Sequence, residues 1–360
     1  MQKKHVVIVG GGYVGVELAK GLEQQLNVTL IEPREVFVHA PAMLRGLVDP
    51  AVRERALIPY DRLLKHGKLI HDRVITVLED RLVLASGDEI AGDFIVLSPG
   101  ASNGGIFKPA DEGIDQFQSA QQQVQTQIAS ASSITIVGAG AVGVELAGEI
   151  AYAYPDKSVT LISAQAELFP DFQAKLGQSL NEKLIGLGVE LILGQRVTDL
   201  NSSTEPYAGM ITLANGQTMS SDLIIPAIGS RPQTSLFSDM PSVQQSPDGR
   251  IQVDPYLRPS SWSNVFAAGD AIDAGDSMTI VSTSRQTPWL IKTIRSLAAG
   301  KSLDSLKAYT PWKSPPILVP LGPERGSSYL FIATFGDWVT RNVKGKELCI
   351  SKYRKLLNYE

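Results

Sequence analysis

Short apolar runs alternate with helix-like segments at two places in the chain, and the two places repeat each other. Residues 8–19 read IVGGGYVGVELA and residues 136–147 read IVGAGAVGVELA, so ten of the twelve positions are identical. Each copy is followed by a second β-branched run, Val28–Ile31 and Val159–Ile162. Each copy therefore predicts a strand, a glycine-rich turn, a helix and a second strand, which together form a βαβ unit.

The glycines of each copy have the G-x-G-x-x-G spacing of a dinucleotide-binding turn. The first glycine permits the tight turn, the second lets a pyrophosphate approach the backbone, and the third lets helix and strand pack closely. One such pattern is weak evidence in a chain with 32 glycines, but two copies directly after apolar strands predict two nucleotide sites. The predicted contacts are Gly10, Gly11, Gly12, Tyr13 and Gly15 in the first copy and Gly138, Gly140 and Gly143 in the second.

The two copies differ where their second strand ends. Glu32 lies 22 residues after Gly10, where an acid accepts hydrogen bonds from ribose hydroxyls. The matching residue in the second copy is Ser163, followed by Ala164 and Gln165. No carboxylate there repels a 2′-phosphate and no basic side chain attracts one, so we expect the second site to accept NADH or NADPH without strong preference.

Composition excludes several classes of protein. With 43% apolar and 19% charged residues, a chain of 360 residues can bury the cores of two or three domains. The 33 basic and 37 acidic residues give a net charge of −4, which does not favour nucleic-acid binding. Cys349 is the only cysteine and the four histidines are scattered, so we expect no disulfide framework and no metal site. Cys349 itself is expected to be a small core residue near a C-terminal strand.

The ends of the chain bear on its location. Only five residues precede the first predicted strand and residue 2 is Gln, which predicts neither a secretory signal nor myristoylation. We therefore expect a cytoplasmic protein. The tail 341–360 has six basic and two acidic residues and predicts a short basic amphipathic helix. This helix either packs on the body of the protein or makes peripheral contact with an anionic membrane.

A third segment resembles part of a known family. Residues 264–271 predict a short strand that leads into a Gly269–Asp270 turn, and a helix is predicted from Ser284 to Ala299. This arrangement resembles the flavoproteins with two dinucleotide-binding domains, the pyridine nucleotide–disulfide oxidoreductase superfamily. The resemblance implies that Asp270 binds the ribityl chain and pyrophosphate of FAD; the alternative is an Asx-turn or helix-capping residue. The strand ends at Gly100 and Gly229 resemble the two points where that family's chain crosses between domains.

The resemblance covers essentially the whole chain and implies its architecture. We expect an α/β fold of two Rossmann-like domains and a short α+β C-terminal domain. The FAD-binding domain would comprise residues 1–109 and 246–302, with an NAD(P)H-binding domain at 110–245 inserted in it. The C-terminal interface domain, 303–360, is shorter than the dimerisation domain of disulfide reductases, which implies a monomer or a weak homodimer.

Two segments resemble one branch of this superfamily more closely, the apoptosis-inducing-factor-like mitochondrion-associated proteins, or ferroptosis suppressor proteins. Residues 37–45 resemble a segment of that branch in which an arginine touches FAD, which implies this role for Arg45. Val74 matches a strand whose backbone meets the adenine, although a plain core valine fits equally well. Thr310 stands where the branch has a lysine, so the function of that lysine is not expected here unless Lys313 replaces it.

The absence of a cysteine pair determines the predicted reaction. With no thiol relay, electrons must leave the flavin directly. The resemblance implies hydride transfer from NAD(P)H to FAD, followed by reduction of a quinone-type small molecule. The alternatives are an NADH-dependent ferredoxin or rubredoxin reductase and a redox sensor similar to apoptosis-inducing factor.

Three residues are candidates for the chemistry itself. Glu145 matches a glutamate that relatives place near the nicotinamide, or it only complements the helix dipole. Gln286 matches part of a quinone-site motif of type II NADH dehydrogenases, with an ordinary surface glutamine as the alternative. His39 is either a proton donor at the flavin edge or a structural residue.

Overall fold

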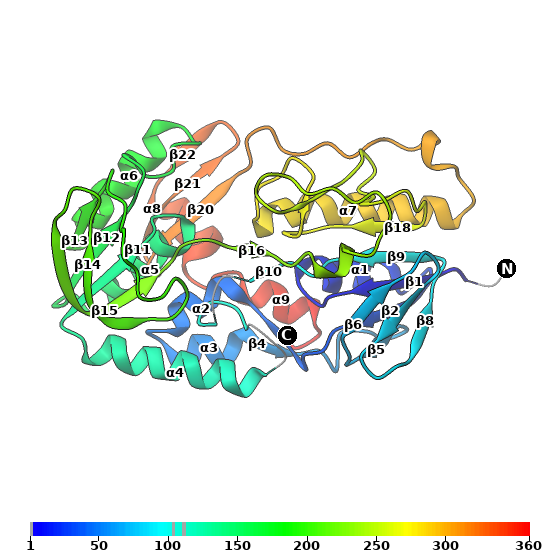
Figure 1. Ribbon diagram of the computed structural model, residues 1–360, viewed down its shortest axis with the longest axis horizontal. Helices are drawn as coiled ribbons and strands as arrows, with labels where there is room; N and C mark the ends of the chain where they lie inside the picture. Colours follow the sequence, from blue (N-terminus) through cyan, green and yellow to red (C-terminus); the bar gives the residue numbers. More distant parts are fainter. Residues whose placement is uncertain (1–2, 103–104, 110–112) are drawn as a thin grey trace.

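Two lobes, each built on a five-stranded sheet, make up the protein (Figure 1). The computed structural model describes residues 3–102, 105–109 and 113–360. The first lobe's sheet is wholly parallel. Its strands in spatial order are β18 (Val265–Ala267), β9 (Phe94–Leu97), β1 (His5–Val9), β2 (Asn27–Ile31) and β5 (Lys68–Ile70). Val6, Val7 and Ile8 of β1 are fully buried, because a central parallel strand is covered on both faces.

Two helices and a small sheet complete the first lobe. Helices α1 (Tyr13–Leu22) and α7 (Ile280–Ala298) pack against each other. The small antiparallel sheet consists of β6 (Val74–Val77), β7 (Arg81–Leu84) and β8 (Glu89–Ala91). A short parallel pair joins β17 (Ile251–Gln252) to β19 (Ile272–Asp273).

The second lobe repeats this plan. Its strands in spatial order are β13 (Val189–Ile192), β12 (Ser158–Ile162), β11 (Ser133–Val137), β15 (Thr218–Pro226) and β14 (Tyr207–Thr212). Only β14 runs antiparallel to its neighbour in this sheet. Its helices are α4 (Ile114–Ser130), α5 (Ala141–Ala153) and α6 (Ala174–Ile185). The predicted α/β fold with two Rossmann-like units is confirmed.

Short elements connect the lobes. The two segments at which the chain crosses pair as β10 (Ala101–Ser102) and β16 (Arg231–Pro232). The remaining elements before α7 are β3 (Val36–Val38), α2 (Ala40–Gly46), α3 (Pro50–Ala56), β4 (Leu57–Pro59) and η1 (Ser235–Phe237). The first predicted domain limit, between residues 109 and 110, adjoins residues 110–112, which lie outside the described residues. The domain limits stay predictions.

The C-terminal region packs against both lobes. It consists of η2 (Leu303–Ser305), β20 (Ile317–Leu321), β21 (Arg325–Leu330), β22 (Ala333–Phe335), α8 (Asp337–Thr340), η3 (Arg341–Gly345) and α9 (Ile350–Leu356). Strands β20 and β21 pack on α5 and α6, whereas α9 contacts α1 of the other lobe (Figure 1). Tyr353 and Leu357 in and after α9 are buried, so the basic tail packs its apolar side on the body of the protein.

One glycine sets how closely the C-terminal region approaches the second lobe. A Cβ atom on Gly148 of α5 would lie 2.6 Å from Cα of Leu321 in β20, a backbone atom that cannot move aside. On α1, a Cβ on Gly21 would instead meet the flexible Cδ1 end of Ile291.

We expect Gly148→Ala to lower the free energy of unfolding by about 1–2 kcal/mol, because overpacking outweighs the gain of about 1 kcal/mol in helix propensity. Urea unfolding of the variant beside Gly21→Ala measures this, since the control gains the same propensity against a yielding neighbour. Equal or greater stability of Gly148→Ala would show that the approach of β20 to α5 is not tight.

Candidate functional site

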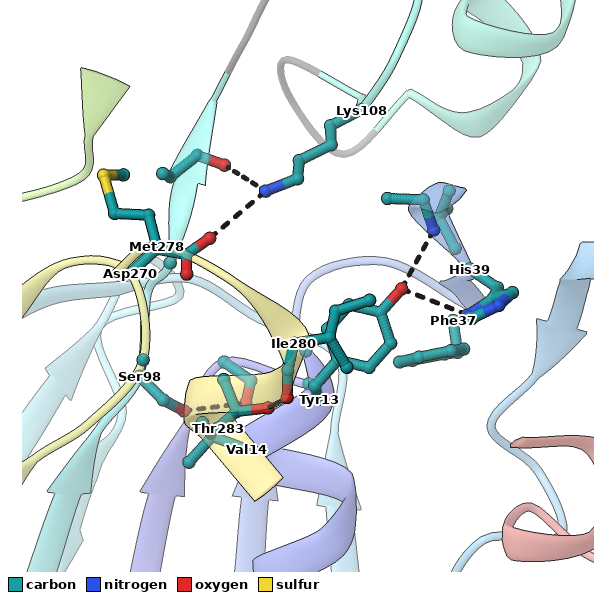
Figure 2. Close-up of a pocket in the computed structure, with 18 of the residues that line it drawn as sticks. Tyr13, Val14, Phe37, His39, Ser98, Lys108, Asp270, Met278, Ile280 and Thr283 are labelled. Carbon is teal, nitrogen blue, oxygen red and sulfur yellow. Dashed lines mark hydrogen bonds and ion pairs between the residues drawn. The ribbon is translucent and has the colours of Figure 1, made fainter. Parts of the chain in front are cut away.

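A cavity of about 830 Å³ lies between the lobes and receives residues from both, as well as from the C-terminal region. Figure 2 shows part of its lining, including Tyr13 and Asp270. Such a volume is typical of small-molecule and cofactor sites. The predicted site residues that line it are Gly10, Gly11, Gly12, Tyr13, Glu32, His39, Val74, Gly100, Glu145 and Asp270. The predicted site residues outside its lining are Gly15, Arg45, Gly138, Gly140, Gly143, Ser163, Gly229 and Gln286.

The glycines of the first turn have distinct roles. Gly10 has φ +95°, and a Cβ there would clash with the carbonyl oxygen of Ser98. A Cβ on Gly15 would clash with the carbonyl oxygen of Gly10. Gly12, the N-cap of α1, differs: its Cβ would meet no atom of the described residues within 4 Å. The open position at a helix N-terminus leaves room for a phosphate beside free N–H donors.

The second turn has the same geometry. Gly138 has φ +110°, and its Cβ would lie 2.6 Å from the carbonyl oxygen of Ala227. A Cβ on Gly143 would clash with the carbonyl oxygen of Gly138. Gly140, the N-cap of α5, again borders open space as far as the described residues extend. Both turns therefore fit a bound dinucleotide.

Glu32 is buried at the end of β2 and holds the first turn. Its Oε2 accepts a hydrogen bond from the backbone N–H of Gly11 at 2.6 Å, and its Oε1 accepts one from Nε of Arg34 at 2.7 Å. Burial opposes ionisation of this carboxyl, but the Arg34 guanidinium keeps its pKa below the usual range. The ionised carboxylate accepts two hydrogen bonds at each oxygen and so fixes the turn, while its predicted contact with ribose hydroxyls stays a prediction.

The matching position of the second unit carries no charge. The Ser163 hydroxyl accepts a hydrogen bond from the backbone N–H of Gln165 at 3.1 Å and is buried. The crossing glycines both have positive φ, +74° for Gly100 and +71° for Gly229. The backbone N–H of Gln233 donates to the Gly100 carbonyl at 2.9 Å, which ties the two crossings together.

Gln286 supports the turn that carries Asp270. Its Oε1 accepts a hydrogen bond from the Gly269 N–H at 2.7 Å, and its Nε2 donates to Asp276 at 3.0 Å. Asp276 also accepts a hydrogen bond from the Tyr309 hydroxyl. Gln286 is only 2% exposed, so the surface-glutamine alternative is wrong. The side chain does not line the cavity; it affects the cavity by holding the turn that carries Asp270.

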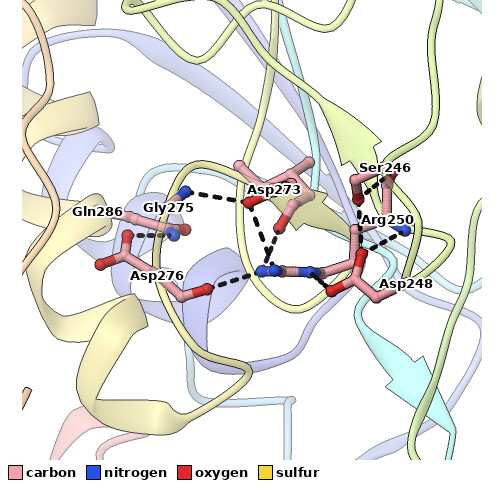
Figure 3. A network of polar contacts seen from close by, with 8 residues as sticks. Ser246, Asp248, Arg250, Asp273, Gly275, Asp276 and Gln286 are labelled. Carbon is pink, nitrogen blue, oxygen red and sulfur yellow. Dashed lines mark hydrogen bonds and ion pairs between the residues drawn. The ribbon is translucent and has the colours of Figure 1, made fainter.

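The same network extends away from the cavity to Arg250 (Figure 3). The Arg250 guanidinium pairs with Asp248 at 2.6 Å and with Asp273 at 3.3 Å, and it donates to the carbonyl of Asp276 at 2.7 Å. The loop that follows the Gly269–Asp270 turn is therefore fixed at several points.

Asp270 itself faces the cavity. Its carboxylate lies 3.4 Å from Nζ of Lys108, which also donates to the Ala101 carbonyl at 3.4 Å (Figure 2). The sequence indicated Asp270 but not Lys108, because the two residues are 162 positions apart.

Arg45 lies outside the cavity lining, and its guanidinium is engaged by other groups, so its predicted contact with FAD stays a prediction. The guanidinium binds both carboxylate oxygens of Glu149 at 2.8 and 2.9 Å and donates to the Gly345 carbonyl at 2.7 Å. Arg45 is 5% exposed and Glu149 is 3% exposed, so this is a buried ion pair that joins α2 to α5 and to η3.

Glu145 stands one turn before Glu149 on α5 and lines the cavity. Its Oε1 lies 2.7 Å from Nζ of Lys344, which also donates to the Leu318 carbonyl at 3.1 Å. Burial raises the pKa of Glu145, and the Lys344 ammonium opposes that rise. The sequence did not indicate that Lys344 pairs with Glu145.

His39 is held in one orientation by the surrounding chain. Its Nε2 contacts the Leu348 carbonyl, which can only accept, so Nε2 carries the hydrogen. Its Nδ1 then accepts from the Tyr13 hydroxyl at 3.1 Å, and that hydroxyl accepts from the Ala40 N–H (Figure 2). Burial lowers the pKa of His39 to about 4, so the imidazole is neutral near pH 7. This geometry favours the structural alternative.

The structure contradicts the position expected for Cys349 and does not distinguish between the two predicted roles of Val74. Cys349 is half-buried, lines the cavity and is the N-cap of α9 with φ +63°, so the expected core position is wrong. Its thiol stays protonated, because burial raises its pKa. Val74 is buried and lines the cavity, which fits either of its two predicted roles.

The described residues contain no cluster of three or more His, Cys, Asp or Glu that could hold a metal ion. Among the helices in the described ranges, none has the length and apolar character that a membrane crossing requires.

The buried neutral His39 predicts a loss of stability in acid. Its pKa is about 4 when folded against an ordinary 6.5, so the unfolded chain binds more protons between those values. We expect the free energy of unfolding to fall by about 3 kcal/mol as pH falls from 6.5 to 4. Urea unfolding across this range should show a smaller fall in His39→Gln and an unchanged one in His66→Gln, an exposed control. An equal fall in the free energy of unfolding for wild type and both variants would contradict the assignment of a neutral His39.

The hydrogen bond from Gly269 to Gln286 predicts that removing the Gln286 amide lowers the affinity for FAD. We expect Gln286→Leu to weaken FAD binding about tenfold, because the turn that carries Asp270 loses its acceptor. Flavin fluorescence on dilution measures the dissociation constant, with Gln123→Leu on the exposed side of α4 as the control. Unchanged FAD affinity in a folded Gln286→Leu protein would exclude this positioning role.

Comparisons with known proteins agree with this geometry. The chain is 31% identical to apoptosis-inducing factor homolog B of Dictyostelium discoideum over 99% of this chain and 97% of that protein. It is 28% identical to human ferroptosis suppressor protein 1 over 96% and 94% of the two chains. The sulfide:quinone oxidoreductase of Aquifex aeolicus shares the fold with a TM-score of 0.77 and 15% identity, covering 99% of this chain and 92% of that one.

The family model for pyridine nucleotide-disulphide oxidoreductases matches residues 4–288, most of the chain and both nucleotide-binding turns. The predicted resemblance and the predicted cofactors are confirmed. This protein belongs to the pyridine nucleotide-disulphide oxidoreductase family and is an oxidoreductase that uses FAD and NAD(P)H.

Proposed function

We propose that this protein is an FAD-dependent NAD(P)H:quinone oxidoreductase. The observation that carries the proposal is the lining of the cavity, which joins the FAD turn to Glu145 of the NAD(P)H lobe and includes apolar residues of the C-terminal region. With Cys349 as its only cysteine, the chain cannot form the dithiol that a disulfide substrate relay requires. A small uncharged acceptor fits such a cavity.

Bound FAD would supply acceptance of a hydride from the nicotinamide and delivery of electrons to the acceptor. The residues of this chain position the reactants. Gly12 and Gly140 leave room for the two pyrophosphates at the starts of α1 and α5. The Glu145 carboxylate, fixed by Lys344, can accept a hydrogen bond from the nicotinamide carboxamide and so orient the ring.

The acceptor side of the cavity is formed by the C-terminal region. Ile317, Leu318 and Val343 line it beside Tyr353. These side chains exclude water and present no thiol relay between the flavin and the acceptor. Cys349 also lines this side, but its protonated, solitary thiol cannot pass a pair of electrons by forming an intramolecular disulfide.

Rapid mixing separates the proposed reaction from its alternatives. Protein reduced anaerobically with NADH or NADPH would be mixed with a short-chain ubiquinone, a ferredoxin or dissolved oxygen. We expect the flavin absorbance to return fastest with the quinone. Fastest reoxidation by ferredoxin would favour the ferredoxin reductase, and slow reoxidation by every acceptor would favour a redox sensor.

The pair of Glu145 and Lys344 can be tested in the same apparatus. We expect Lys344→Met to slow flavin reduction by NADH at least tenfold, about 1.4 kcal/mol of activation free energy, because Glu145 loses its partner. Lys355→Met, an exposed lysine on α9, is the matched control. Equal reduction rates in both variants would exclude a role of Lys344 in orienting the nicotinamide.

A further inference from the structure

The repeat between the two lobes extends beyond the glycine turns, to the segment that follows β5 in the first lobe and β13 in the second. In the first lobe the backbone N–H of Ala85 donates a hydrogen bond to the carbonyl of Arg73 at 2.8 Å. In the second lobe the backbone N–H of Ala214 donates to the carbonyl of Arg196, also at 2.8 Å. Arg73 and Arg196 therefore occupy equivalent positions in the two lobes.

The residues that follow these two arginines repeat the same backbone pairing. Val74 pairs with Leu84 in the first lobe and Val197 pairs with Leu213 in the second, and both pairs are antiparallel. The carbonyl of each leucine accepts a hydrogen bond at 2.9 Å from the N–H of the glycine three positions later, which closes a tight turn in both lobes. The equivalence of the two segments therefore does not depend on a single hydrogen bond.

The position of Arg73 indicates where its equivalent lies relative to the second nucleotide site. Arg73 lines the cavity together with Glu32, the residue predicted to meet the ribose of the first nucleotide. In the second lobe the carbonyl of Ser163, which matches Glu32, accepts a hydrogen bond from the backbone N–H of Gln195 at 2.9 Å. Arg196 is the next residue, so it lies beside the position expected for the adenosine ribose of NAD(P)H.

The two adenosine positions differ in their charged groups. The first has the Glu32 carboxylate near Arg73, whereas the second has the Ser163 hydroxyl near Arg196. Arg196 is exposed, and its guanidinium makes no hydrogen bond or ion pair with any residue in the described ranges. All donors of this guanidinium are therefore available to a bound ligand.

We propose that Arg196 binds the 2′-phosphate of NADPH and that the protein therefore prefers NADPH to NADH. A guanidinium binds a phosphate through two parallel charge-assisted hydrogen bonds, and the uncharged Ser163 does not repel the phosphate as a carboxylate would. The sequence predicted no strong preference, because Arg196 lies 33 positions after Ser163 and only the fold brings the two together. The preference rests on the use of NAD(P)H to reduce the flavin and is independent of the proposed quinone acceptor.

Two acids lie close to this site along the chain. The Asp199 carboxylate accepts hydrogen bonds from the N–H and the hydroxyl of Thr212, at 2.6 and 2.7 Å, which hold it to β14. Glu167 is exposed and lies four positions after Ser163. Recognition of the phosphate would thus depend on direct contact with one guanidinium and not on a surplus of positive charge, and a Glu167 carboxylate that faced the site would oppose it.

The experiment uses the full-length flavoprotein, whose first nucleotide site is filled by FAD. Calorimetric titration with adenosine 2′,5′-bisphosphate and with AMP measures binding at the adenosine position without any reaction. The variants are Arg196→Gln, Arg196→Lys and the control Lys175→Gln, which removes one positive charge from an exposed position on α6 of the same lobe. Anaerobic reduction of the flavin at increasing NADPH or NADH concentration gives the dissociation constant of each coenzyme.

We expect wild type and Lys175→Gln to bind the bisphosphate at least tenfold more tightly than AMP, because only the bisphosphate reaches the guanidinium. Arg196→Gln should lose this difference while its affinity for AMP stays unchanged, and Arg196→Lys should keep part of the difference because it keeps the charge. The same pattern should distinguish NADPH from NADH in the reduction of the flavin.

Equal affinity of wild type for the bisphosphate and AMP, the result expected if Glu167 faces the site, would overturn the assignment. Equal losses in Arg196→Gln and Lys175→Gln, or an equal loss of both ligands in Arg196→Gln, would overturn it as well. A flavin that NADPH reduces but no quinone reoxidises would instead overturn the proposed quinone reductase function and leave the role of Arg196 intact.

Discussion

Two carboxylates buried one helical turn apart on α5 determine how the three parts of this protein meet. Glu145 and Glu149 are 5% and 3% exposed, and burying either without a partner would cost several kcal/mol. Arg45 comes from the first lobe to neutralise Glu149, and Lys344 comes from the C-terminal region to neutralise Glu145. The charges balance only when α2, α5 and η3 are together, so the requirement for neutrality fixes the walls of the cavity.

This constraint also explains the close approach of the C-terminal region. The Gly345 carbonyl accepts from Arg45, and the Leu348 carbonyl accepts from His39, so two points of the same segment are anchored to the first lobe. Lys344, just before the first point, and Cys349, just after the second, line the cavity. The segment thereby completes the site that the two nucleotide-binding turns begin.

The sequence predicted those parts of the site whose residues lie close together along the chain. The glycine turns and Glu32 follow from spacing within one βαβ unit, because the strand, turn and helix of that unit are adjacent in the chain. The ion pair of Arg45 with Glu149 could not be predicted, because Glu149 is 104 residues away and no local pattern connects the two. The partner of Glu145 is 199 residues away, and the cavity position of Cys349 depends on the same non-local packing.

The electrostatic state of the lining favours an uncharged acceptor. Several titratable lining groups are neutral near pH 7: burial lowers the pKa of His39, and it raises the pKa values of Tyr13, Cys349 and Tyr353, which already lie above neutrality. Six of the charged lining groups occur as opposite pairs: Glu32 with Arg34, Glu145 with Lys344 and Asp270 with Lys108. A strongly charged partner would find no net complementary charge among these groups, whereas a quinone needs none. The same burial that orders the C-terminal segment therefore supports the proposal of an uncharged acceptor.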